Sequence, residues 1–469
     1  MKIFILGAGP AGMAVADGLT DNQSGKFILL EKSTGLGGLA QTLMWNQIGS
    51  HDLGPHKIFS LDQALVNRVE GLLPAQDWLT RKKVSSIYMK GHYLPYPPSP
   101  FSLACVFGLP AFIRMVLGYG LAKISSLFKL SKSQTFEQDL VGRVGQPLYQ
   151  FLFKPIAVKL WGDPKSLDVK LSKGRVQTPS LLEIFGRLLK IKKSSQFEAL
   201  TFRYPKGGLG RIWQAIAAKS KNQGQLLLGH TVTGLEFEGR KIHQIKFMYE
   251  GVEGKFNLGP EDQVVSTLPL NHTIQIMAKA LPPHFQSLAE KVVELNDLLL
   301  VFLNVDQASL LNESWVFIPD PDVIFHRISE QESFDPAMTP NGSIVCCEIM
   351  SSKTRPLASK QDDELCRLAI DGLKGMGYNN FKVLDQKVIR LPKSYPVFGC
   401  GFETGLTEII QGLDQFENFR SIGRQGAFNY IGTLDAMDIG YGYASWIKAA
   451  QSRPWKEERE RTNHYPVLD

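Results

Sequence analysis

The first 31 residues alternate between short apolar runs and a segment with helical periodicity. Two apolar runs, KIFIL at residues 2–6 and KFILLE at residues 26–31, flank the glycine-rich turn GAGPAG and the helical segment MAVADGLT. Continuous apolar runs of this length are typical of strands buried on both faces of a sheet. The pattern therefore predicts strand, turn, helix and strand, which is how a doubly wound parallel sheet begins.

Further changes of pattern divide the rest of the chain. From about Gly142 to Ile191 apolar residues recur at helical spacing, which predicts a helical subdomain. Residues 225–268 hold short β-rich runs between glycines, and residues 271–392 combine strand-like runs with the helical segment DDELCRLAIDGLKGMG. Residues 421–450 predict a strand, a loop and a closing helix. A chain of 469 residues is long enough for two cores, so we expect two lobes with a cleft between them.

The glycine-rich turn carries the first candidate chemistry. Gly7, Gly9 and Gly12 form GxGxxG between the first strand and the first helix. Glycines at these positions permit a tight turn and let the backbone approach a pyrophosphate at the helix N-terminus. Glu31 ends the second strand, where an acidic side chain binds ribose hydroxyls. The sequence therefore predicts a dinucleotide site.

Composition excludes several other classes of function. Lys and Arg (52) exceed Asp and Glu (45) to give a net charge of +7, but they form no block that would track a phosphate backbone, so we expect no nucleic-acid partner. The five cysteines show no CxxC spacing, which argues against a disulfide framework or a zinc site and favours the cytoplasm. His51, His56 and His92 lack ligand spacing, so no metal is expected.

The most apolar stretch runs from Phe101 to Ala122. Gly108, Pro110 and Arg114 interrupt it, whereas a spanning helix needs roughly 20 cleanly apolar residues. We expect a buried or surface-docking pair of helices here, and peripheral membrane contact through residues 101–122 is an alternative. The N-terminal MKIFILGAG predicts a strand and shows no export signal, which again favours the cytoplasm.

Three separated segments resemble one flavoprotein superfamily. The continuation EKSTGLGGLAQT, with Gly37 and Gly38, is similar to the extended glycine signature of the FAD-dependent amine-oxidase superfamily, which includes protoporphyrinogen oxidase, carotenoid desaturases and UDP-galactopyranose mutase. Residues 419–424, followed by a helix from Met437 onward, resemble its second flavin-binding stretch, and Val232 resembles its adenine-contacting residue. The resemblance implies non-covalent FAD, because no attachment residue is visible, and it assigns cofactor contacts to Gly7, Gly9, Gly12, Glu31, Gly37, Gly38, Leu39, Val232, Gly423, Arg424 and Met437.

Several local motifs resemble the UDP-galactopyranose mutases in particular. The resemblance of DLGPHKIFS places His56 near the flavin ring, and that of FKPIAVKLWGDPKSL makes Trp161 a wall of the sugar site. Arg175 matches an arginine that clamps the substrate diphosphate, a role that suits the planar donor fork of a guanidinium. In GRQGAFNY, Arg424 would lie by the flavin and Tyr430 would offer its hydroxyl to a diphosphate.

Two positions depart from the mutase pattern. The mutases carry an acid two places after the tyrosine, but Gly432 stands here, and the nearest acids are Asp435 and Asp438. A second diphosphate arginine is also expected at the start of a strand, where this chain has Asn296. One half of the diphosphate clamp is therefore missing from the pattern.

The predicted fold is α/β, with a Rossmann-type FAD-binding lobe (a doubly wound parallel sheet) and an interleaved α+β substrate lobe that includes the helical subdomain. The expected boundaries are residues 1–60, 200–270 and 393–455 for the FAD-binding lobe, 61–199 and 271–392 for the substrate lobe, and 456–469 for a polar, solvated tail.

Three hypotheses follow for the function. The first is an FAD-dependent oxidoreductase of the amine-oxidase or protoporphyrinogen-oxidase type, whose hydrophobic substrate gives a hydride to flavin N5. The second is a nucleotide-sugar mutase that uses reduced FAD, with His56, Trp161, Arg175 and Tyr430 at the reacting sugar. The third is a binding module in which FAD is only structural. The first two require a small-molecule substrate bound in the cleft.

Overall fold

The first lobe is built on a parallel sheet. The computed structural model describes residues 1–21, 26–127, 133–176, 201–462 and 465. Five strands in the order β19-β13-β1-β2-β9 form this sheet, and every neighbouring pair is parallel. The predicted Rossmann-type lobe is thereby confirmed. The strands are β1 (Lys2–Leu6), β2 (Lys26–Glu31), β9 (Gly224–Leu228), β13 (Gln263–Ser266) and β19 (Phe419–Ser421).

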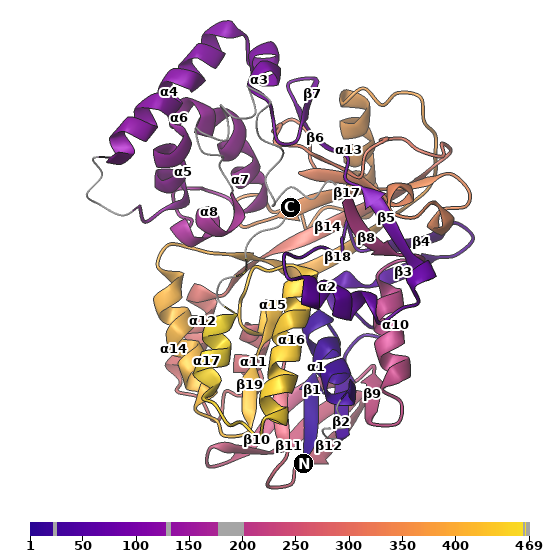
Figure 1. Cartoon of the computed structure of the whole chain (residues 1–469), viewed down its shortest axis with the longest axis vertical. Helices are drawn as coiled ribbons and strands as arrows, with labels where there is room; N and C mark the ends of the chain where they lie inside the picture. Colours follow the sequence, from indigo (N-terminus) through magenta and orange to yellow (C-terminus); the bar gives the residue numbers. More distant parts are fainter. Residues whose placement is uncertain (22–25, 128–132, 177–200, 463–464, 466–469) are drawn as a thin grey trace.

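Alternate residues of β1 enter two different cores. Ile3 and Ile5 pack in a cluster with α1, α10 and α16, whereas Phe4 and Leu6 pack in a second cluster that includes the hairpin strands β10 and β11. Both faces of β1 are therefore buried, as in a doubly wound sheet. Figure 1 shows these helices standing beside the sheet in the lower half of the molecule. The elements are α1 (Pro10–Asp21), α10 (Gly210–Lys219), α16 (Thr433–Lys448), β10 (Thr231–Glu238), β11 (Lys241–Tyr249) and β12 (Val252–Asn257).

The second lobe contains a mixed sheet of seven strands. Its order is β18-β14-β17-β16-β15-β6-β7, and the pairing is antiparallel except between β15 and β6. The long strand β14 reads ELNDLLLVFLNV because both of its faces are covered, one by α13 (Asp362–Gly375). The strands are β6 (Ser85–Met89), β7 (His92–Pro95), β14 (Glu294–Val305), β15 (Trp315–Phe317), β16 (Arg327–Glu330), β17 (Ser343–Ser351) and β18 (Val383–Val397).

A group of helices projects from the upper part of the molecule (Figure 1). The apolar stretch 101–122 folds as the predicted helical pair, and the predicted helical subdomain is helical as far as Arg175. Its remaining part, residues 177–191, lies outside the described residues. The helices are α3 (Pro100–Phe107), α4 (Leu109–Leu127), α5 (Phe136–Val144), α6 (Gln146–Leu148), α7 (Lys154–Leu160) and α8 (Val169–Arg175).

One short hairpin, one two-stranded sheet and one helix complete the described structure near the junction of the lobes. Strand β3 (Thr42–Trp45) pairs with β4 (Gly49–Asp52), and β5 (Trp78–Lys82) pairs with β8 (Thr201–Pro205). Helix α2 (Gln63–Glu70) begins at Asp62, whose side chain accepts backbone hydrogen bonds, and packs near α16.

The predicted solvated tail needs correction. Residues Trp455–Arg461 form α17, and Trp455 is buried against the rings of Tyr443 and Trp446. Arg459 donates two hydrogen bonds of 2.7 Å to Asp414. The sequence KEERER suggested solvent, but one tryptophan and a bidentate ion pair fix this helix to the first lobe.

The second correction concerns helices expected in the substrate lobe. Helix α11 (Leu270–Ile276) and helix α12 (His284–Val292) pack in the same core as α14 (Phe402–Asp414) of the first lobe. A Cβ at Gly412 would lie 2.3 Å from the ring of Phe285, so the glycine allows close contact of α12 with α14. Apolar complementarity between these helices, which the sequence does not display, places them there.

No helix among the described residues is long and apolar enough to cross a membrane.

The contact of α1 with α16 provides a test of the packing. A Cβ at Gly440 would lie 2.2 Å from the carbonyl oxygen of Ala11, which is backbone and has little freedom to move. We expect Gly440→Ala to lower the free energy of unfolding by about 1–3 kcal/mol through overpacking. Gly375→Ala in α13 is the control, since its Cβ would meet nothing within 4 Å. Equal urea midpoints for the two variants would contradict this account.

Candidate functional site

One large cavity connects the two lobes. Its volume is about 1500 Å³, and its walls come from both ends of the chain and from the substrate lobe. Gly7, Gly9, Glu31 and Val232 line one part of it, while Arg175, Tyr395, Arg424 and Tyr430 line another. A cavity of this volume suits a ligand larger than a typical drug-sized molecule.

The glycine turn forms the first wall. Gly7 has φ +101°, and its N–H donates 2.8 Å to the carbonyl of Leu30, which fixes the turn beside β2. A Cβ at Gly12 would lie only 2.0 Å from the carbonyl oxygen of Gly7, whereas a Cβ at Gly9 would meet nothing within 4 Å. Gly12 therefore closes the turn, and Gly9 leaves open space at the N-terminus of α1, where backbone N–H groups favour anions.

Glu31 lies where the sequence placed it, at the cavity edge of β2. Its Oε2 accepts from the N–H of Ala8 at 2.8 Å, and its Oε1 accepts from the N–H and hydroxyl of Ser33, each at 2.9 Å. These bonds hold the carboxylate in one position. A carboxylate can accept further hydrogen bonds, so ribose hydroxyls are suitable donors.

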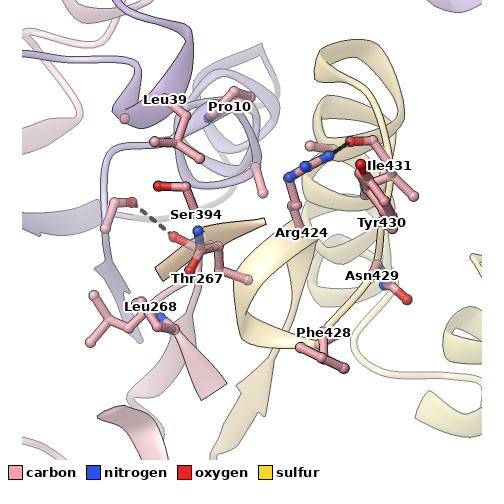
Figure 2. Close-up of a pocket in the computed structure, with 18 of the residues that line it drawn as sticks. Pro10, Leu39, Thr267, Leu268, Ser394, Arg424, Phe428, Asn429, Tyr430 and Ile431 are labelled. Carbon is pink, nitrogen blue, oxygen red and sulfur yellow. Dashed lines mark hydrogen bonds between the residues drawn. The ribbon is translucent and has the colours of Figure 1, made fainter. Parts of the chain in front are cut away.

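Thr267 and Leu268 line the cavity, and Figure 2 shows them below Leu39 and to the left of Arg424. The hydroxyl of Thr267 donates 3.0 Å to the carbonyl of Leu6, which ties the end of β13 to the end of β1. Gly38 and Leu39 face the same cavity. These backbone segments meet at the carboxyl ends of parallel strands, the usual ligand edge of such a sheet.

Tyr430 is the centre of an aromatic and cationic cluster. The guanidinium of Arg175 lies 3.8 Å from its ring centroid, and that of Arg424 lies 4.8 Å from it. Trp161 and Tyr395 approach the same ring edge-on at 6.3 and 5.7 Å. Three of the four predicted catalytic residues, Trp161, Arg175 and Tyr430, are therefore brought together from separate segments of the chain.

Arg424 is held from behind by the loop that follows it. Its Nη1 donates to the carbonyl of Ile431, as Figure 2 shows, and its guanidinium lies 5.4 Å from the ring of Tyr395. Burial lowers the pKa of Arg424, although an arginine remains charged at neutral pH. Desolvation of this kind strengthens the attraction of the guanidinium for an anion.

His56 lines the same cavity beside an ion pair that the sequence did not indicate. Its Nδ1 lies 3.0 Å from the carbonyl of Gly54, so Nδ1 carries the proton and Nε2 is an acceptor. Desolvation lowers the pKa of His56 to about 4, which keeps the ring neutral at pH 7. Arg327 donates to Glu348 through Nε at 2.5 Å and Nη2 at 2.8 Å, and both residues line the cavity.

Five of the predicted site residues do not line the cavity. Trp161 is buried behind Tyr430, and Met437 is fully buried in the core of the first lobe. Gly37 and Gly423 allow close packing, against the ring of Trp213 and the Cβ of Ala11. These residues pack behind the lining residues and so affect the shape of the cavity wall. The five are Gly12, Gly37, Trp161, Gly423 and Met437.

The two departures from the mutase pattern are visible in the structure. Asn296 is buried and its Nδ2 donates 2.9 Å to the carbonyl of Leu160, so this position serves the packing of β14. Gly432 lines the cavity, and its N–H donates 3.0 Å to Asp435 Oδ2. Burial raises the pKa of Asp435, which also lines the cavity. Asp438 instead accepts from Arg461 and Tyr465, each at 2.6 Å.

Sequence reasoning missed Arg327, Glu348 and Tyr395. Arg327 and Glu348 are opposite each other in the register of β16 and β17, and Tyr395 comes from the far end of β18. Their juxtaposition depends on strand pairing, so no local motif marks it. Among the described residues, no group of three His, Cys, Asp or Glu side chains is arranged for a metal.

Comparisons with known proteins agree with this geometry. Residues 5–69 match the family model of the NAD(P)-binding Rossmann-like domain. The structure of reduced UDP-galactopyranose mutase superposes with a TM-score of 0.85 at 19% identity, over 99% of this chain and 98% of that one. This chain shares that fold. The resemblance to the superfamily, inferred from the motifs, is thereby confirmed for the fold.

The same fold occurs in proteins with different names. Cyclohexylamine oxidase from Brevibacterium oxydans IH-35A superposes with a TM-score of 0.67 at 14% identity, over 96% of this chain and 99% of that one. A CLA-producing fatty acid isomerase from P. acnes superposes with a TM-score of 0.61 at 12% identity, over 96% of this chain and 98% of that one. The fold therefore does not select the reaction, which must be argued from the side chains of the cavity.

Buried imidazoles near the cavity predict a pH dependence of stability. Desolvation lowers the pKa of His51 to about 4, like that of His56, and lowers that of His326 well below its ordinary value. In the unfolded chain these rings bind protons near pH 6.5, so stability falls as the pH drops from about 6.5 to about 4. Asp52 has the opposite effect on stability. Burial raises its pKa to about 6, so as the pH falls the folded state binds a proton at Asp52 before the unfolded state does.

Burial also raises the pKa of Glu313, Glu332 and Asp435, so these carboxyls offset part of the imidazole effect. The test therefore isolates the contribution of one imidazole to the change in urea midpoint between about pH 7 and about pH 4.5. His51→Gln removes one of these rings, and the loss of stability between the two pH values should be smaller in that variant. An identical loss in the variant and the unmodified chain would show that His51 does not contribute.

Proposed function

We propose that this chain is a flavoenzyme that binds FAD non-covalently in the cavity. Support comes from the position of the glycine turn, Glu31 and Val232 along one part of the wall and of Thr267 and Arg424 further along it. Gly9 and the N-terminus of α1 would receive the diphosphate, and Glu31 the ribose hydroxyls. When bound, a flavin supplies a ring that accepts or donates an electron pair at N5.

The residues present fit such a cofactor. The space above Gly9 is open, and the backbone of Gly38 lies so close that its Cβ would be 3.1 Å from the Cα of Gly9. Side chains at either position would fill the place where a diphosphate must approach the backbone. Protein packing does not require glycine at position 9, because a Cβ there would meet nothing within 4 Å. A ligand that approaches the backbone closely would require it.

For the reaction, we propose chemistry of the nucleotide-sugar mutase type on an anionic substrate. The single observation that carries this proposal is the stacking of Arg175 and Arg424 on Tyr430 at 3.8 and 4.8 Å. Two partly desolvated guanidinium groups at one end of a cavity attract an anion such as a diphosphate. Tyr430 orients both cations and offers its hydroxyl, and the neutral His56 accepts a hydrogen bond without adding charge.

An FAD-dependent oxidoreductase is the second candidate. The observation that favours it is the role of Asn296, which is engaged in packing where a second clamping arginine would be expected. Leu298 and Leu391 add apolar surface to the cavity wall, which suits a hydrophobic substrate. In this case Arg175 and Arg424 would hold a single carboxylate or phosphate of that substrate, or the cofactor itself.

Gly9→Ala tests the cofactor site. The methyl group meets no protein atom within 4 Å, so the fold should be retained, but it occupies the space proposed for the diphosphate. We expect the purified variant to carry at least tenfold less flavin than the unmodified chain, by absorbance near 450 nm, with an unchanged thermal midpoint. Gly375→Ala is the matched control and should keep its flavin. A yellow Gly9→Ala protein, with full flavin content, would contradict the site.

Arg175→Ala tests the substrate proposal. Loss of a charge-assisted hydrogen bond costs about 1.5–3 kcal/mol, so the dissociation constant for UDP or UDP-galactose should rise at least about tenfold. The measurement is the shift of the visible flavin spectrum, oxidised and dithionite-reduced, during titration. Arg390→Ala is the control, because that arginine pairs with Asp362 away from the cavity.

The outcomes separate the candidates. A spectral response that weakens in Arg175→Ala supports the mutase type and leads to an assay of sugar ring interconversion. A yellow protein that responds to neither nucleotide would remove that proposal and leave the oxidoreductase, which is then tested by anaerobic bleaching of the flavin with apolar anionic substrates.

A further inference from the structure

Helices α3 and α4 present large apolar side chains to solvent. Phe101 is 79% exposed, Leu109 is 65% exposed and Leu121 is 67% exposed. Apolar patches of this kind on a folded chain mark an interaction surface. We define the α4 face by its exposed members, which are Phe101, Leu109, Ile113, Val116, Leu117, Leu121 and Ile124.

The exposed residues form one continuous stripe. Along α4 they recur every three or four residues from Leu109 to Ile124, which places them on one side of the helix. The opposite side packs on the protein: Met115 is buried, and Gly118 approaches Pro147, whose Cδ would lie 2.7 Å from a Cβ there. The solvent side thus carries the larger apolar residues, the reverse of an ordinary surface helix.

The surrounding sequence is basic and contains no acid. Residues 78–136 hold no Asp or Glu, while eight Lys or Arg residues are spread through them. Arg114 is exposed on α4 itself. An apolar stripe within a basic segment has the composition of a surface that binds acidic phospholipids. Of the eight basic residues, Arg114 and Lys123 lie on α4, and the ammonium of Lys90 lies 5.0 Å from the ring centroid of Phe107 at the end of α3.

The α4 face is separate from the cavity. Helix α4 lies along the outer edge of the projecting helices, with α5, α6 and α8 on its inner side (Figure 1). Among the described residues between 60 and 169, none lines the cavity, so this face lies outside the proposed cofactor and substrate site. Its apolar character therefore needs an explanation of its own.

We propose that the α4 face docks on the surface of a bilayer that contains acidic phospholipids. The apolar side chains enter the boundary between headgroups and acyl chains, and the basic residues approach the anionic headgroups. A second copy of this chain is a poorer partner, because two acid-free basic segments would face each other. A nucleic acid would match the charge, but it would leave the apolar stripe without a partner.

The test is co-sedimentation of the purified full chain with vesicles. We expect binding to vesicles of phosphatidylcholine and phosphatidylglycerol, at least tenfold weaker binding to phosphatidylcholine alone, and a decrease at high salt. The double variant Leu117→Glu with Leu121→Glu should bind the acidic vesicles at least tenfold more weakly. The control is Val252→Glu with Leu384→Glu, which alters two equally apolar, exposed positions elsewhere and should bind like the unmodified chain.

Unchanged binding of the α4 double variant, with a normal thermal midpoint, would overturn the proposal. So would a dimer in light scattering that the variant abolishes while neither protein sediments with vesicles, since a second copy would then cover the face. If the double variant fails to fold, Arg114→Gln with Lys123→Gln replaces it, and the preference for acidic over neutral vesicles must fall for the proposal to stand.

Discussion

The close approach of backbone to backbone around the first turn is the constraint on which the cavity depends. The absence of side chains at Gly12 and Gly440 lets α1 lie against the turn carbonyl of Gly7 on one side and against α16 on the other. Helix α16 follows directly on the segment that carries Arg424 and Tyr430. The packing that shapes the nucleotide end of the cavity therefore also sets the position of its cationic end, although the two come from opposite ends of the sequence.

The charged residues of the cavity wall are held in two different ways. Arg327 is neutralised by a bidentate bond to Glu348, which suits a buried pair because both partners keep their hydrogen bonds. The guanidinium groups of Arg175 and Arg424 instead lie against aromatic rings, which attract a cation and orient its planar donor group. The neutral ring of His56 adds no competing charge.

Local sequence was sufficient for the parts of the fold and site that are themselves local. The glycine turn, Glu31 and the sheet that they begin could be predicted because the residues that act together lie within one strand, turn and helix. Arg327 and Glu348 could not be predicted, since they meet through the register of two strands. The same limit applies to α17: its polar composition suggested solvent, and only the packing of Trp455 and the bond from Arg459 to Asp414 show why it is folded.

The first lobe and the cavity wall carry different information about function. A parallel sheet with a glycine turn presents a dinucleotide in much the same way whatever the reaction, so similarity of this lobe cannot distinguish a mutase from an oxidase. The differences must come from side chains that reach the cavity from β16, β17, β18, α8 and the loop before α16. In this chain those segments contribute Arg175 and Arg424, which stack on Tyr430, and Arg327, which is paired with Glu348. Asn296 stands where the mutase pattern has a further arginine, and its side chain is used for packing. Under the proposed function, a substrate carries one anionic group at the Tyr430 cluster, and the rest of its binding comes from shape and from apolar contact with residues such as Leu298.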